Sequence, residues 1–224
     1  ARYPYGKQRR ARGGMWYTPV SGIWQSVWME CVPRVYISGL KIETDTQKVR
    51  ITVKLGGAGG RAEPEAAAGH AAKTKAGITV TIRLHDGAMY RLQAAIRLAD
   101  GKPYQPVLWS TEHPYLYEMS VTMGEDTVFS YFGLRTVEVK KVDGIHRVCL
   151  NGEPIFLQGV LDQGYFCDGI YLPAKEEEYE QDVLRMKALG MNLLRKHIKI
   201  EPECFYYYCD IHGMLVMQDM VNNG

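Results

Sequence analysis

Polar side chains that can bind a ligand follow three short apolar runs in the last third of the 224-residue chain. Each run is about as long as a strand, and each ends on groups that carry charge or several hydrogen-bonding atoms. The most informative of these residues are Asp162, Arg195, His197 and Asp219. A ligand with many hydroxyl groups needs several oriented donors and acceptors at once, and these side chains offer both. They predict a site for a polyhydroxylated ligand, provided that the fold brings the ends of the three runs together.

Three strands and two helices would have to position these residues. The apolar runs cover 155–161, 191–196 and 214–218, and apolar residues at helical spacing lie between them, over 176–189 and 202–212. The order strand, helix, strand, helix, strand indicates a parallel sheet with right-handed crossovers. The carboxyl ends of parallel strands share one edge, which is where α/β barrels keep their binding groups. Three strands cannot close a barrel, so we expect the beginning of a barrel whose remainder is absent from this chain.

A simpler interpretation of the same residues is structural. Arg195 and Asp219 can form a buried ion pair, and His197 can be a core histidine whose hydrogen bonds are satisfied. That reading suits any one residue taken alone. We favour a site because polar clusters follow three successive strands.

Residues 32–142 have a different pattern, with short strands, turn signals and no long helix. Alternating or apolar runs predict strands over 35–42, 48–55, 77–84, 90–98, 116–123 and 127–132. About seven strands in this length are typical of an immunoglobulin-like β-sandwich. Within it, residues 56–77 are rich in Gly and Ala and can bury little surface, so we expect a long hairpin loop or a mobile insertion there.

Residues 1–31 end in an apolar segment with two tryptophans. Residues 23–29 carry apolar groups on both faces of an expected strand. Trp24 and Trp28 fit the core of a sandwich, and the alternative is that they are exposed and stack on sugar rings.

Three segments carry a resemblance to a known family. These are NGEPIFLQGV at 151–160, DVLRMKALGMN at 182–192 and CDIHGMLV at 209–216. They resemble the opening of the catalytic barrel in glycoside hydrolase family 2, which includes β-galactosidases, β-glucuronidases and β-mannosidases. The segments 106–117 and 131–139 resemble the sandwich of that family, and SGIWQSVW at 21–28 looks like the end of its jelly-roll sugar-binding domain.

The resemblance implies three parts: terminal strands of a jelly-roll domain over 1–31, an immunoglobulin-like sandwich over 32–142, and the first βαβαβ units of an incomplete TIM barrel over 143–224. The fold class is therefore mainly β with an α/β part. Arg195 matches the arginine that ends the second barrel strand of the family, and Asp219 matches the acidic position that ends the third. His197 resembles a nearby histidine, although one residue separates it from Arg195 here and the galactosidase branch usually has two.

The resemblance also implies retaining hydrolysis of an O-glycosidic bond, which needs two carboxyl groups about 5 Å apart. In this family they are glutamates that end the fourth and seventh barrel strands, the first in an Asn-Glu pair. No Asn-Glu pair occurs in this sequence. We therefore expect no catalytic residue and no glycosidase activity in these 224 residues, and a substrate-binding role for the four residues above in the whole enzyme.

The composition of the chain bears on its partners, its location and its cofactors. A net charge of +2 gives no reason to expect a nucleic acid or an anionic membrane as partner, and no apolar run approaches the ~20 residues that span a bilayer. The first ten residues lack the apolar segment of a signal peptide. Five scattered cysteines are expected to be free thiols, which indicates a reducing compartment and predicts a cytoplasmic location. No spacing suggests a metal or another cofactor.

Two expectations concern partners. A carbohydrate substrate is expected for the whole enzyme, and an incomplete barrel would leave apolar surface uncovered, so we expect a homodimer through residues 150–224. The alternative function is a non-catalytic carbohydrate-binding or domain-interaction module, which would bind sugar without turning it over.

Overall fold

The computed structural model of the protein describes residues 5–11, 13–57, 71–73, 79–84, 92–97 and 106–221. The chain divides into two compact units. The sandwich unit is Met29–Ile155, and the α/β unit combines Ala1–Trp28 with Phe156–Gly224. The domain boundaries expected from the sequence stay a prediction.

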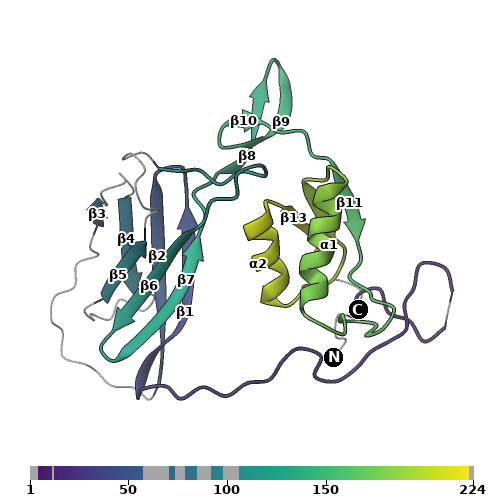
Figure 1. The fold of residues 1–224 in the computed structure, drawn as a ribbon, viewed down its shortest axis with the longest axis horizontal. Helices are drawn as coiled ribbons and strands as arrows, with labels where there is room; N and C mark the ends of the chain where they lie inside the picture. Colours follow the sequence, from purple (N-terminus) through teal and green to yellow (C-terminus); the bar gives the residue numbers. More distant parts are fainter. Residues whose placement is uncertain are drawn as a thin grey trace. The chain divides into compact units, whose positions relative to one another are not determined.

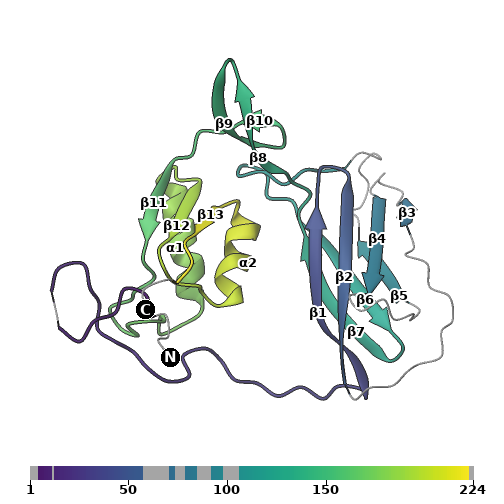
Figure 2. The ribbon, with the colours of Figure 1, turned by 180° about the vertical axis from the view of Figure 1, so that it is seen from behind.

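The sandwich unit contains two sheets that face each other (Figures 1 and 2). The first sheet has the order β1 (Val35–Thr44), β2 (Lys48–Gly57), β4 (Thr79–Leu84), β3 (Ala71–Lys73). The second has the order β5 (Leu92–Arg97), β6 (Tyr117–Met123), β7 (Asp126–Phe132). These elements confirm the strands predicted over 35–132. The described part of this unit is all β, as an immunoglobulin-like sandwich predicts.

Alternation along the strands builds the core of this unit. In β2, Val49, Ile51 and Val53 are buried while Lys48 and Arg50 are exposed. The inward residues of β6 pack into the same cluster as those of β2. Because side chains of a strand point alternately to its two faces, each sheet presents one apolar face to the other.

The connection from β2 to β4 differs from the sequence expectation. Residues 56–77 were expected to form a hairpin loop or a mobile insertion, but β2 and β4 pair in parallel, which a hairpin cannot produce. Ala71–Lys73 forms β3, which pairs antiparallel with the far side of β4. Between β2 and β4 the chain forms β3, which runs in the opposite direction to β2. Because β4 is antiparallel to β3, it runs in the same direction as β2. Residues 58–70 and 74–78 lie outside the described residues.

A third, smaller sheet follows in the sandwich unit, with antiparallel strands in the order β10 (Glu153–Pro154), β9 (Ile145–Leu150), β8 (Val137–Val142). Asn151 ties it to the segment before β6, because its Nδ2 donates to the Trp109 carbonyl oxygen at 2.9 Å. Trp109 is fully buried, and the Arg135 guanidinium lies 4.4 Å from its ring centroid. These contacts hold the segment before β6 against the third sheet.

The α/β unit contains the expected alternation of strands and helices. Its elements are β11 (Gly159–Asp162), α1 (Glu177–Ala188), β12 (Leu193–Lys196), α2 (Glu203–His212) and β13 (Leu215–Gln218). Both strand pairs are parallel, and the sheet order is β11-β12-β13. The predicted parallel sheet is confirmed. Whether it opens a TIM barrel stays a prediction.

Proline and glycine residues mark the ends of the two helices. Pro202 precedes the first residue of α2, where its missing N–H leaves no bond unmade. Gly213 ends α2 at φ +73° and Gly190 follows α1 at φ +82°, a left-handed conformation that glycine adopts without steric penalty. The two helices cover one face of the sheet (Figures 1 and 2), where Tyr179 and Val183 pack with Leu194.

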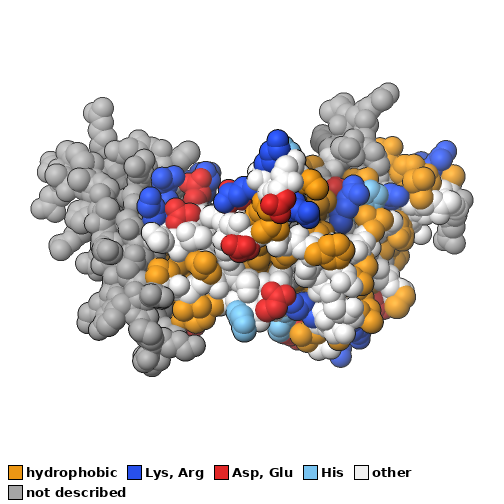
Figure 3. All heavy atoms as spheres, turned by 90° about the horizontal axis from the view of Figure 1, so that it is seen from above, with side chains coloured by type: hydrophobic (Ala, Val, Ile, Leu, Met, Phe, Trp, Pro, Cys, Tyr) orange, Lys and Arg blue, Asp and Glu red, His pale blue; other side chains and the backbone are white. Residues whose placement is uncertain are grey.

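The other face of this sheet is open. Leu161 and Met217 point away from the helices and are 50% and 46% exposed. Phe156 and Met220, just outside the sheet, are also exposed. In the space-filling view, hydrophobic side chains reach the surface in several groups among the charged ones (Figure 3).

The amino-terminal segment lies against the α/β unit through aromatic contacts. The ring of Tyr17 stacks on Tyr165 with centroids 3.7 Å apart, and Trp24 meets Tyr171 edge-on at 4.7 Å. The strand predicted over 23–29 is not formed, and Trp28 is exposed. Neither tryptophan is therefore in a sandwich core. The reason is that the segment has no described neighbouring strand with which its backbone pairs.

All five cysteines are free thiols, as predicted. Among the described residues, neither helix has the length and apolar character that crossing a bilayer requires. The cytoplasmic location stays a prediction.

Candidate functional site

The candidate site lies at the carboxyl ends of β11, β12 and β13. In the parallel register Asp162 is level with Lys196, and Lys196 is level with Gln218. Arg195 precedes this row by one residue, and Asp219 follows it by one. Because successive side chains of a strand point to opposite faces, this edge carries two different groups of polar residues, one on each face of the sheet.

The first group consists of Arg195, His197 and Asp219. The Arg195 guanidinium grips the Asp219 carboxylate with two nitrogens, Nε at 3.2 Å from Oδ1 and a terminal nitrogen at 3.0 Å from Oδ2. This two-point geometry fixes both side chains. The pair is not buried, since 51% of the Arg195 side chain and 23% of the Asp219 side chain are exposed. The buried ion pair of the simpler interpretation is therefore not found.

His197 lies beside this pair. Its Nε2 is 3.9 Å from Asp219 Oδ2, and its backbone N–H donates to the Asp162 carbonyl oxygen at 2.8 Å. The other ring nitrogen, Nδ1, is buried and has no protein partner. The same is true of Gln163 Oε1, which follows β11. Buried polar atoms normally have a partner, so the idea of a satisfied core histidine does not fit.

Asp162 belongs to the second group, on the face that the helices cover. Its Oδ2 accepts from Lys196 Nζ at 2.7 Å, and its Oδ1 accepts from the Gly164 N–H at 2.8 Å. The structure thus brings three of the four predicted residues into one cluster. Asp162 joins that cluster through its backbone, while its carboxylate faces Lys196, which was not among the predicted site residues.

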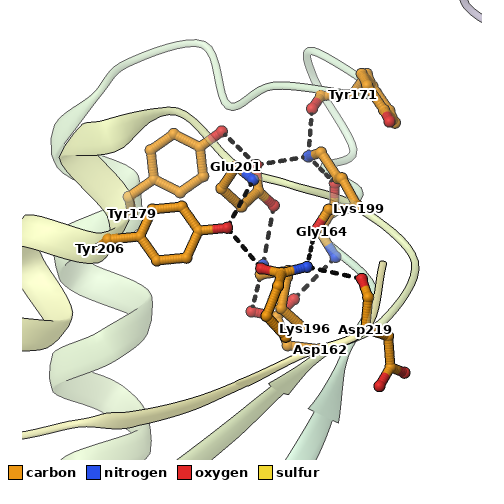
Figure 4. Close-up of polar contacts among 10 residues, drawn as sticks. Asp162, Gly164, Tyr171, Tyr179, Lys196, Lys199, Glu201, Tyr206 and Asp219 are labelled. Carbon is orange, nitrogen blue, oxygen red and sulfur yellow. Dashed lines mark hydrogen bonds and ion pairs between the residues drawn. The ribbon is translucent and has the colours of Figure 1, made fainter. Parts of the chain in front are cut away.

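Lys196 is part of a buried network of charges (Figure 4). Its Nζ contacts Glu201 Oε1 at 2.9 Å, and Lys199 Nζ contacts Glu201 Oε2 at the same distance. The three side chains are no more than 1% exposed. Lys199 also donates to the carbonyl oxygens of Gly164 and Tyr171. We call Asp162, Lys196, Lys199 and Glu201 the buried charge network.

Neutral groups complete the surroundings of this network. Tyr179 donates its hydroxyl to Glu201 Oε2 at 3.1 Å. Tyr206 accepts from the Glu201 N–H and donates to Gln218 Oε1 at 2.6 Å. Gln218 Nε2 donates to the carbonyl oxygens of Lys199 and Asp219. The network and these groups together connect the ends of all three strands.

Burial decides the proton affinities here. It raises the pKa of Tyr179 above its ordinary value, and the nearby Glu201 carboxylate adds to the rise. It lowers the pKa of Lys199 below its ordinary value, although Glu201 acts in the opposite direction. Both shifts favour the neutral form, as removal from water requires.

The predicted site did not include Lys196, Lys199 or Glu201. A signal was present, because alternation along β12 places Lys196 on the same face as the core residue Leu194. A lysine on a core face needs a carboxylate partner, and Glu201 is a carboxylate a few residues away. No group of three or more potential metal ligands occurs among the residues that the structure describes.

Comparison with known proteins shows a similarity to one family of enzymes. Residues 35–135 match the family model of the glycosyl hydrolases family 2. The β-galactosidase of Thermoanaerobacter pseudethanolicus is 26% identical over 218 residues, which is 91% of this chain and 28% of that protein. A putative β-glucuronidase of Formosa agariphila is 27% identical over 215 residues, which is 89% of this chain and 24% of that protein.

Solved structures share the fold. The β-D-glucuronidase of Dictyoglomus thermophilum superposes with a TM-score of 0.62 over 84% of this chain and 30% of that one, at 17% identity. A Ruminococcus gnavus β-glucuronidase gives the same TM-score over 85% of this chain and 29% of that one, at 15% identity. The chain thus spans about a quarter of the length of the curated relatives named here. Over residues 35–135 the chain is similar to the glycosyl hydrolases family 2.

Proposed function

We propose that the protein carrying this chain is a retaining β-glycosidase that hydrolyses O-glycosidic bonds. In this proposal the α/β unit opens its catalytic barrel. The cluster of Arg195, His197 and Asp219, with Asp162 beside it, holds the sugar at the cleavage subsite. The single observation that carries the proposal is the half-exposed Arg195–Asp219 pair next to the unpartnered Nδ1 of His197.

The cluster suits a sugar because it has hydrogen-bonding capacity left over. Arg195 contacts both oxygens of Asp219, and a carboxylate can accept further hydrogen bonds. Arg195 is half exposed, and His197 Nδ1 lacks a partner. Neighbouring sugar hydroxyl groups donate and accept at the same time, so they match an acceptor, a donor and an imidazole nitrogen at one edge.

Holding the sugar contributes to rate as well as affinity. Hydrogen bonds to hydroxyl groups that strengthen in the transition state supply on the order of several kcal/mol in glycoside hydrolysis. The chemistry itself needs two carboxyl groups about 5 Å apart, one as nucleophile and one as acid and base. The carboxylates at this edge are engaged by cations, Asp162 and Glu201 by lysines and Asp219 by Arg195. We therefore assign no catalytic residue within these 224 residues.

The test uses the whole protein and a panel of 4-nitrophenyl β-glycosides that includes the galactoside, glucuronide and mannoside. Arg195→Ala is expected to lower kcat/KM on the best substrate by about tenfold or more. Arg185→Ala is the matched control, because Arg185 pairs with Asp182 on the exposed surface of α1. An unchanged rate in Arg195→Ala rejects the sugar-binding role. Sugar affinity without turnover in the unmodified protein would favour a non-catalytic binding module instead.

A further inference from the structure

Glu201 is the centre of the buried charge network. Its carboxylate is fully buried, and each oxygen accepts from a different lysine. One lysine, Lys196, ends β12 and carries the network to Asp162 at the end of β11. The other, Lys199, holds the loop after β11 through the carbonyl oxygens of Gly164 and Tyr171. A single side chain thus connects two strands and two loops.

The charges of the network balance within it. Lys196 and Lys199 supply two positive charges, and Asp162 and Glu201 supply two negative ones. An unpaired charge in such a place is strongly unfavourable, and a balanced cluster with satisfied hydrogen bonds avoids that. The removal of one member affects the others because they share partners.

Backbone segments and hydrogen bonds connect the network to the proposed sugar-binding cluster, by which we mean Arg195, His197 and Asp219. The segment from His197 to Glu201 runs between the two, and Ile198 within it has φ +56°, an uncommon conformation for a β-branched residue. Gln218 Nε2 donates to the Lys199 carbonyl oxygen on one side and to the Asp219 carbonyl oxygen on the other. The Asp219 N–H in turn donates to the Lys196 carbonyl oxygen. The backbone of both His197 and Asp219 is therefore held by residues of the network.

The position of Gly164 shows how closely the backbone after β11 approaches the Glu201 carboxylate. A Cβ at Gly164 would collide with Glu201 Oε1 and come within 3.0 Å of Lys199 Nζ. The loop after β11 thus approaches the network so closely that only a residue without a side chain fits. Packing of this kind restricts movement of the strand ends.

From these contacts we propose that Glu201 is a positioning residue for the sugar-binding cluster. Its two lysine contacts hold the strand ends and the 197–201 segment in the arrangement that sets His197 and Asp219 against Arg195. The inference rests on the proposed function of that cluster. Glu201 itself does not touch the sugar, and its effect passes through the backbone of its neighbours.

The experiment compares Glu201→Gln with Val183→Ala in the whole protein. Val183 is fully buried among the same helices, so its truncation destabilises the same unit without touching the network. The measured quantities are KM and the inhibition constant of the monosaccharide released from the best 4-nitrophenyl glycoside. Neither depends on the fraction of protein that is folded, so a purely structural defect leaves both unchanged.

Glu201→Gln is expected to raise both KM and the inhibition constant of the monosaccharide about fivefold or more, because misplaced groups bind the sugar less tightly. Val183→Ala is expected to leave the inhibition constant within twofold, because a loss of stability does not change the affinity of the molecules that remain folded. Equal inhibition constants in Glu201→Gln and the unmodified protein would overturn the proposal.

A second variant guards against failure of Glu201→Gln to fold. Tyr206→Phe removes the hydroxyl that joins the Glu201 N–H to Gln218 and leaves all four charges in place. It is expected to raise the inhibition constant about twofold to fivefold, in the range of one lost hydrogen bond. No change in Tyr206→Phe would count against the proposal. Arg195→Ala distinguishes failure of the sugar-binding proposal from failure of the positioning proposal. If Arg195→Ala has no effect, the sugar-binding role of the cluster is rejected. If Arg195→Ala has an effect but Glu201→Gln and Tyr206→Phe have none, only the positioning role of Glu201 is rejected.

Discussion

Lys196 and Glu201 form an ion pair of 2.9 Å in which the two side chains are 1% and 0% exposed. Lys196 occupies a core-facing position of a parallel strand, where the ammonium group also lies 4.3 Å from the centroid of the Phe205 ring. A buried pair of this kind adds little net stability compared with apolar residues, but the loss of one partner is strongly unfavourable. The removal of one member of this pair should therefore cost much more stability than the intact pair contributes.

Lys196→Met should destabilise the α/β unit by about 3–5 kcal/mol, because Asp162 and Glu201 both lose the cation between them. Chemical denaturation followed by circular dichroism at 222 nm measures this unit, since α1 and α2 both belong to it. Arg185→Met breaks an exposed pair with Asp182 and should cost less than about 1 kcal/mol. A similar small loss in both variants would show that the buried pair has no special weight.

Gly164→Ala should destabilise the α/β unit more than Gly190→Ala does. Both glycines have positive φ, so alanine is strained at either position by about 1–2 kcal/mol. A Cβ at Gly190 has open space, with one atom of Gln158 at 3.9 Å, whereas a Cβ at Gly164 collides with Glu201. The difference between the two unfolding free energies therefore measures the crowding alone, and equal losses would contradict the close fit at Gly164.

Alkaline pH should destabilise the α/β unit. Burial raises the pKa of several tyrosines above the ordinary value of 10, among them Tyr165, Tyr171, Tyr179 and Tyr206. A raised pKa means that the folded state holds its proton longer than the unfolded state, so the stability these groups contribute is complete below pH 10 and is lost as the pH rises further. Burial lowers the pKa of Lys199, which acts in the opposite sense: stability rises with pH between its folded pKa and 10.5. With several tyrosines against one lysine, the net change above pH 10 is a loss.

Absorbance at 295 nm tests this directly, because it follows ionisation of the tyrosine hydroxyl. The buried tyrosines should ionise only when circular dichroism at 222 nm reports unfolding, while exposed tyrosines ionise earlier. If all 15 tyrosines of the chain titrate together near pH 10 with the helices intact, the burial of these hydroxyls is not maintained in solution.

The chain is expected to associate through residues 150–224. The open face of β11, β12 and β13 carries Leu161 and Met217, each about half exposed, and Phe156 and Met220 add to the apolar surface. Exposed apolar patches and open sheets favour contact with another chain. Sedimentation velocity should show a dimer that Leu161→Lys weakens, while Val139→Lys, an exposed position in β8 of the other unit, leaves it unchanged. A monomer at all concentrations contradicts this expectation.

Local sequence patterns were sufficient to predict most of the helices and strands. The spacing of apolar residues predicted α1 and α2 over 176–189 and 202–212, close to their observed bounds. Strand alternation predicted β1, β2 and β6, because the period of two depends only on neighbours along the chain. The parallel pairing of β11, β12 and β13 followed from their alternation with helices.

Long-range contacts decided what local patterns could not. Residues 23–29 read as a strand, but a strand exists only with a partner, and Trp24 instead meets Tyr171. The parallel pairing of β2 with β4 depended on a third strand, β3, in a segment whose composition suggested only a loop.

By itself the sequence determined which strand ends carry polar groups, since the position of Asp162, Arg195, His197 and Asp219 relative to apolar runs is a property of the chain. Only the tertiary structure decided how those groups divide between the two faces of the sheet. It set Arg195 on Asp219 and turned Asp162 toward Lys196. The physical reason is that a buried lysine must find carboxylates, and only the packed strands and helices decide which carboxylates lie within reach.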